Sequence, residues 1–85
     1  MAIAYNNRGW VYAMLGQYER AMQDLDEAIR LDPQLAEAYT NRGVVYGDLG
    51  QYERAIQDWD EAIRLNPQYP DALTYGNRGA AYHNL

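Results

Sequence analysis

The stretch GQYERA occupies residues 16–21 and recurs unchanged at residues 50–55, which lie 34 positions further along the chain. The identity extends to both sides, because residues 2–35 and 36–69 carry the same amino acid at 25 of 34 aligned positions. A tandem repeat of this length is typical of folds in which each unit is one supersecondary motif that stacks on the next. The sequence therefore predicts two repeats, 2–35 and 36–69, and in 70–85 a partial third repeat or a capping helix.

Apolar residues in each repeat follow the helical period, and polar residues face the other way. Apolar-rich stretches at Ala4–Leu15 and Ala38–Leu49 precede the quoted motif, and each is followed by a glycine that can adopt the left-handed conformation that ends a helix. A proline at 33 or 67 ends the second helix of each unit, because proline restricts the residue before it. Each unit is predicted to be two helices joined by a tight turn. The second-helix apolar stripe of the first unit contains Tyr18, Ala21, Met22, Leu25, Ala28 and Ile29.

A set of spaced residues resembles the tetratricopeptide repeat. It comprises Tyr5, Arg8, Gly9, Tyr12, Ala21, Leu25 and Pro33, and again Tyr39, Arg42, Gly43, Tyr46, Ala55, Trp59 and Pro67. The resemblance implies an all-α fold for a single domain, 1–85, in which antiparallel helix hairpins stack into a short right-handed α-solenoid of about five helices. Two departures stand out, since tyrosine replaces the family's usual tryptophan at 5 and 39, and arginine replaces its leucine at 8 and 42.

The glycines and arginines of the motif lead to two packing expectations. Gly43 lies inside a helix, where glycine is costly, so we expect a close approach of the facing helix at Ala55. A leucine at 43 would then overpack the contact. The long side chains of Arg8 and Arg42 need an acceptor near their tips, and the sequence predicts that these acceptors are Asp24 and Asp58.

Where the two repeats differ, the differences gather on one face of the first helix of each unit. In tetratricopeptide proteins the first helices line a concave groove that holds a peptide or a partner's helix, and the resemblance places the differing positions in that groove. Trp10 and Met14 lie one helical turn apart there, as on many binding surfaces. An alternative is that these are solvent positions that vary freely. The predicted peptide- or partner-binding residues are Ile3, Asn6, Trp10, Ala13, Met14, Glu37, Thr40, Val44, Asp48 and, from the third unit, His83.

The chemistry of these residues suggests the kind of ligand. The family's carboxylate clamp for chaperone tails uses lysine, arginine and asparagine, whereas this chain has no lysine and only Asn7 and Asn41 match. With Glu37 and Asp48 expected at its centre, the groove instead suits a protein or peptide with apolar anchors and a basic residue.

Composition and charge exclude several classes of function. The chain contains seven arginines and twelve acidic residues, and its net charge of −5 disfavours nucleic acid and anionic membranes as partners. No apolar run approaches a membrane span, the start lacks a signal core, and cysteine is absent, which fits a cytoplasmic protein.

Evidence for an enzyme is weak. The carboxylate pairs Asp24/Glu27 and Asp58/Glu61 are expected to form solvated ion pairs with nearby arginines rather than acid–base dyads. His83 is the sole histidine, and neither a metal site nor a cofactor is expected. The sequence predicts an interaction module (a scaffold or adaptor). The alternative is a structural or engineered repeat fragment that self-associates and has no ligand.

The third unit contains one helix without a partner helix. It repeats the first-helix pattern with an offset of 36 residues, and the connection QYPDALTY carries two more residues than QLAEAY. Its apolar residues would be exposed unless another surface covers them. A homodimer is therefore expected, through this helix or by its exchange between chains. The residues assigned to self-association are Leu73, Tyr75, Tyr82 and Leu85.

Overall fold

The computed structural model of the protein describes residues 1–67 and 72–85, and for residues 72–75 it describes the backbone alone. The described chain forms five α-helices: α1 Ala2–Met14, α2 Tyr18–Leu31, α3 Ala36–Asp48, α4 Tyr52–Leu65 and α5 Ala72–Asn84. The all-α prediction is confirmed. Helices α1 and α3 each begin two residues earlier than the sequence predicted, at Ala2 and Ala36.

The turn after each first helix is built on a glycine, as predicted. Gly16 and Gly50 have positive φ values of 75° and 79°, a conformation that glycine adopts without steric cost. The Gln17 amide donates to the Tyr12 carbonyl at 2.9 Å, and the Gly16 amide donates to the Ala13 carbonyl at 3.0 Å. This pair of bonds satisfies the carbonyls at the end of α1 and reverses the chain toward α2. The same pair recurs after α3.

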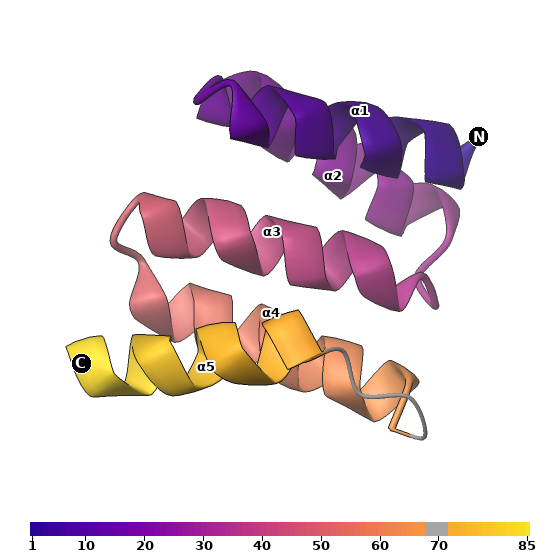
Figure 1. Ribbon diagram of the computed structural model, residues 1–85. Coiled ribbons are helices and arrows are strands. Elements are labelled where there is room, and N and C mark those ends of the chain that lie inside the picture. The colour runs from indigo at the N-terminus through magenta and orange to yellow at the C-terminus, as the bar shows by residue number, and fades with distance from the viewer. Residues whose placement is uncertain (68–71) are drawn as a thin grey trace.

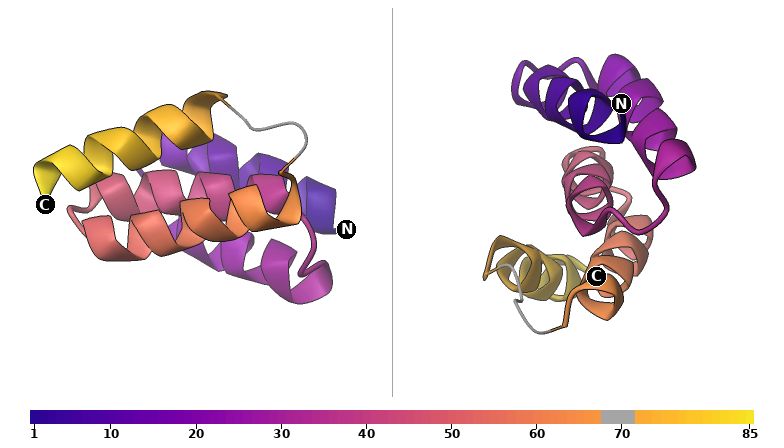
Figure 2. Two further views of the ribbon diagram at one scale, coloured as in Figure 1. Left: turned by 90° about the horizontal axis from the view of Figure 1, so that it is seen from below. Right: turned by 90° about the vertical axis from the view of Figure 1, so that its right-hand side faces the viewer.

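The helices form two layers (Figures 1 and 2). Helices α1, α3 and α5 run in the same direction along the inner side of a curved stack, and α2 and α4 cover the outer side. Each hairpin packs internally, and α3 and α5 also pack against the second helix of the preceding unit. The stacking places the carboxyl ends of α1, α3 and α5 at one end of the inner layer.

Two glycines allow the helices of each hairpin to approach closely. A Cβ atom on Gly43 would lie 2.4 Å from Trp59 Nε1, and one on Gly9 would lie 2.9 Å from Leu25 Cγ. The facing helices were predicted correctly, and the three atoms nearest to the Cβ position of Gly43 all belong to the indole of Trp59. The indole nitrogen donates to the Thr40 carbonyl at 3.1 Å, which holds the ring over the glycine.

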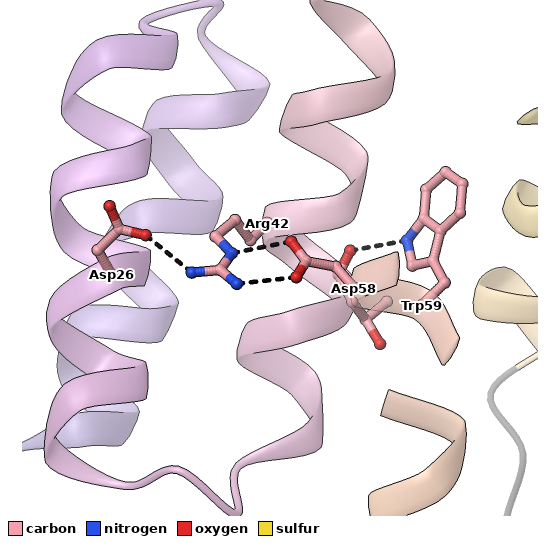
Figure 3. A network of polar contacts seen from close by, with 5 residues as sticks. Asp26, Arg42, Asp58 and Trp59 are labelled. Carbon is pink, nitrogen blue, oxygen red and sulfur yellow. Dashed lines mark hydrogen bonds and ion pairs between the residues drawn. The ribbon is translucent and has the colours of Figure 1, made fainter. Parts of the chain in front are cut away.

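Arginine–aspartate pairs bind the helices to one another. Arg8 donates two hydrogen bonds to Asp24, at 2.7 and 2.8 Å, and Arg42 donates two to Asp58, both at 2.8 Å. Both predicted pairs are confirmed. Arg42 also donates to Asp26 of the preceding unit at 3.0 Å, so that it lies between two carboxylates (Figure 3).

The environment of these pairs differs from the solvated one that the sequence suggested. Asp24 and Asp58 are each only 6% exposed, because the first helix of the unit covers them. The paired carboxylates hold the pKa of the Arg42 guanidinium above its usual range. Glu27 and Glu61 do form exposed pairs, with Arg30 and Arg64 respectively.

Candidate functional site

A cavity of about 420 Å³ opens between the carboxyl ends of α1 and α3 and the start of α2. Its walls combine large apolar side chains with one carboxylate. Met14 is 70% exposed, and Trp10 and Val44 are half-buried. We call this the anchor cavity; its lining residues are Trp10, Ala13, Met14, Leu15, Gly16, Tyr18, Val44 and Asp48.

A second cavity, of about 240 Å³, lies on the other side of α3, where α3, α4 and α5 meet. Val44 and Asp48 line both cavities, so that these two residues form the ridge between them. The buried indole of Trp59 lines the second cavity, and α5 adds two amides, Asn77 and Asn84. The two cavities lie side by side across this ridge, and we call them together the groove.

The structure brings together five of the predicted binding residues, which are Trp10, Ala13, Met14, Val44 and Asp48. Asn6 and Thr40 do not line these cavities, because α1 and α3 pack against neighbouring helices there and leave them 2% and 5% exposed.

Three further predicted residues are exposed but lie elsewhere. Ile3 and Glu37 lie in the first turns of α1 and α3, and His83 lies near the end of α5 without lining either cavity. Glu37 and Asp48 are eleven residues apart on α3, which corresponds to about 16 Å along the helix axis. The two carboxylates therefore do not share a site.

The buried Asn6 has a structural role that its variation between the repeats did not reveal. Its Oδ1 accepts a hydrogen bond from Asn41 Nδ2 at 2.9 Å, and this bond ties α1 to α3. Asn41, one of the two asparagines that matched the carboxylate clamp, uses its side-chain amide in this contact.

Asp48 provides the negative charge of the site. Within the described part of the chain it forms no ion pair, and its hydrogen bond is a long one, 3.4 Å from the Tyr18 hydroxyl. Its negative charge raises the pKa of Tyr18, and burial and the hydrogen bond act in the same direction. Asp48 is also the last residue of α3, where the backbone carbonyls carry partial negative charge. The carboxylate and the helix end both contribute negative electrostatic potential at the site.

Several residues that line the two cavities were not among the binding residues predicted from the sequence. Leu15, Gly16 and Tyr18 belong to the turn and second helix, and Tyr52 lines the second cavity. Each is identical in the two repeats, so a criterion based on differences between repeats could not find them. The available signal for these lining residues was their position at a turn glycine or within two residues of one.

The described residues contain no group of three or more His, Asp or Glu side chains that could hold a metal ion. Among them there is likewise no helix long and apolar enough to cross a membrane.

The self-association prediction concerns α5, and the structure describes two of the four side chains assigned to it. Tyr82 and Leu85 are 56% and 64% exposed, whereas Ala81 is buried against Ala55, Ile56 and Trp59. A Cβ atom on Gly79 would meet nothing within 4 Å. The side chains of Leu73 and Tyr75 lie outside the described part of the structure.

Comparisons with known protein families identify the same helical repeat. A family profile described as TPR repeat matches residues 9–50, and one described as tetratricopeptide repeat matches residues 36–69. No curated protein shows a significant match to the sequence.

Several solved structures resemble the whole chain. The second TPR domain of Spaghetti (RPAP3), bound to the HSP90 peptide SRMEEVD, is 31% identical with a TM-score of 0.89; the match covers 98% of this chain and 75% of that one. The OM64 TPR domain of Arabidopsis is 26% identical with a TM-score of 0.91, covering 99% and 68%. The second TPR domain of human RPAP3, bound to the HSP70 peptide SGPTIEEVD, is 27% identical with a TM-score of 0.86, covering 95% and 66%.

Proposed function

We propose that this chain, which belongs to the tetratricopeptide repeat family, is a protein-interaction module that holds a peptide or a partner's helix in the anchor cavity. The observation that carries the proposal is the grouping of Trp10, Met14 and Val44 around an open cavity beside an exposed carboxylate. Solved members of the fold in complex with peptides support the general class of function.

Apolar burial supplies most of the binding energy in this proposal. Met14 is largely exposed in the unbound protein, and covering an apolar side chain contributes about 25 cal/mol for each Å² removed from water. Methionine is flexible and adapts to the shape of a ligand, whereas the Trp10 ring offers a rigid surface. A cavity of about 420 Å³ has room for a large apolar side chain of a ligand.

The Trp10→Ala, Met14→Ala double variant tests this proposal. Selection of a random peptide library on the unmodified protein should enrich peptides with apolar side chains, and the double variant should lose at least roughly tenfold in affinity for them, because two anchors are removed. Isothermal titration calorimetry on the enriched peptides measures the loss.

A matched control removes the same kind of surface elsewhere. Val11 and Leu31 are 53% and 39% exposed and line neither cavity. The Val11→Ala, Leu31→Ala double variant should bind the enriched peptides with unchanged affinity. Equal losses in the two double variants, or a selection that enriches no peptide, would contradict the proposal.

Self-association through α5 is a second proposal, which the open face of that helix favours. Gly43 of α3 is covered by Trp59, whereas Gly79, its counterpart in α5, has an open face beside the exposed Tyr82 and Leu85. We expect a homodimer in which α5 packs against α5 of a second copy or is exchanged between copies.

Light scattering across a hundredfold range of protein concentration tests for the dimer. The mean mass should rise from 9.8 kDa toward twice that value, and Tyr82→Glu should shift the midpoint to higher concentration by placing a charge in the contact. His83→Glu, which changes a neighbouring exposed residue, is the control. A mass that stays at 9.8 kDa throughout rules out the dimer.

A further inference from the structure

We infer that Asp48 makes this groove selective for a peptide that carries a basic side chain beside its apolar anchor, and that the same carboxylate excludes acidic tails. This inference rests on the proposed function, since it concerns which ligand the groove accepts. The chain would then differ in ligand charge from the similar domains whose bound peptides end in EEVD.

The position of Asp48 gives it control over any peptide that lies along the groove. Asp48 and Val44 line both cavities, so a ligand that fills the anchor cavity and continues toward α5 must cross them. Of the two, Val44 offers an apolar surface and Asp48 offers a charge. The ligand side chain that follows the anchor therefore meets the carboxylate.

The charge at this position is specific to the middle helix. The three equivalent positions on α1, α3 and α5 are Met14, Asp48 and Asn84. The first and the last are neutral, so a single charge lies at the centre of the groove between an apolar end and an amide end. A ligand with a cation at its centre matches this order.

The carboxylate is also poorly compensated within the protein. Within the described residues it has no cationic partner, and the hydroxyl of Tyr18 is 3.4 Å away. The carboxyl ends of α1, α3 and α5 lie on the same side of the inner layer as Asp48, which is the last residue of α3, and they add partial negative charge (Figure 1). Helices α2 and α4 begin at the same end, but Glu19 and Glu53 in their first turns oppose the positive charge of those ends. A ligand cation gains from this potential, and a ligand carboxylate is repelled by it.

Two labelled peptides of opposite charge test the inference. One is SAMEEVD, the peptide that a similar domain binds with alanine in place of its arginine, and the other is SAMKKVK, in which lysine replaces each acidic residue. Fluorescence anisotropy at about 0.15 M salt gives the dissociation constant of each peptide. The unmodified protein should bind the basic peptide at least roughly tenfold more tightly than the acidic one.

Variants of two carboxylates on the same helix separate a local effect from net charge. Asp48→Lys should abolish or reverse the preference. Glu37→Lys makes the same change of net charge about 16 Å away along α3, which exceeds the screening length of about 8 Å at this salt, and should leave the preference within roughly twofold. Asp48→Asn, which preserves size, should reduce the preference without reversing it. Circular dichroism melting verifies that each variant is folded.

The outcomes distinguish this inference from the proposed function. Equal or tighter binding of the acidic peptide by the unmodified protein would overturn the inference and leave the proposed function intact. Equal changes in the peptide preference after Asp48→Lys and after Glu37→Lys would have the same consequence. If neither probe binds, the peptides enriched from the random library decide: an excess of lysine and arginine next to the apolar anchor supports the inference, and its absence overturns it. A library that enriches nothing contradicts the proposed function itself.

Discussion

A leucine at position 43 should lower the free energy of unfolding by about 1–3 kcal/mol, because the position has no room for a side chain. Even a Cβ atom would lie 2.4 Å from Trp59 Nε1. The indole cannot move away at low cost, since it is 3% exposed and its nitrogen donates to the Thr40 carbonyl. Urea denaturation followed by circular dichroism measures the change.

Gly79→Leu is the matched control for this prediction. Gly79 holds the equivalent position in α5, and a Cβ atom there would meet nothing within 4 Å. Leucine favours the helical conformation over glycine, so at concentrations at which the protein is monomeric this variant should be as stable as the unmodified protein or more stable. Equal destabilisation by the two leucines would show that the close approach of α4 to Gly43 is not the cause.

Removal of the Asp58 carboxylate should destabilise the protein by about 2–3 kcal/mol, because it leaves a charged group partly desolvated. The side chain of Arg42 is only 21% exposed, and after Asp58→Ala it retains one of its carboxylate partners, Asp26. The same denaturation experiment measures this loss.

The first repeat and the arginine itself provide the controls for Asp58→Ala. Asp24→Ala should cost less, because Arg8 is 60% exposed and water can hydrate the released guanidinium. Adding Arg42→Leu to Asp58→Ala should recover part of the stability, since the uncompensated charge is then absent. Losses of the same size for Asp58→Ala and Asp24→Ala, or no recovery in the double variant, would contradict this explanation.

Features that depend on local pattern and period could be predicted from the sequence. The 34-residue repeat predicted the hairpins and their stacking, and the lone glycines after each first helix predicted the turns, because few other residues adopt a positive φ. The partners of Arg8 and Arg42 also followed, since a long cation on a packed face requires a nearby acceptor.

Features that depend on exact side-chain placement could not be predicted from the sequence. The helical period identifies the face of α4 that meets Gly43 but not which side chain on that face lies nearest, and it did not reveal that the indole of Trp59 covers the glycine. Variation between the repeats marked Asn6 and Thr40 as surface residues, although packing buries both. Tyr18 and Tyr52 were overlooked for the opposite reason, because lining residues that are identical in both repeats carry no such mark.

The most direct test of the proposed binding site is to map the bound ligand by NMR. A peptide enriched from the library is titrated into isotopically labelled protein, and the chemical shifts of assigned amides and side chains are followed. The largest changes are predicted at Trp10, Met14, Val44 and Asp48, with small changes at the exposed outer residues Gln23 and Gln57. Largest changes on the outer helices α2 and α4, with Trp10 and Val44 unaffected, would contradict the proposal that the inner groove binds the ligand.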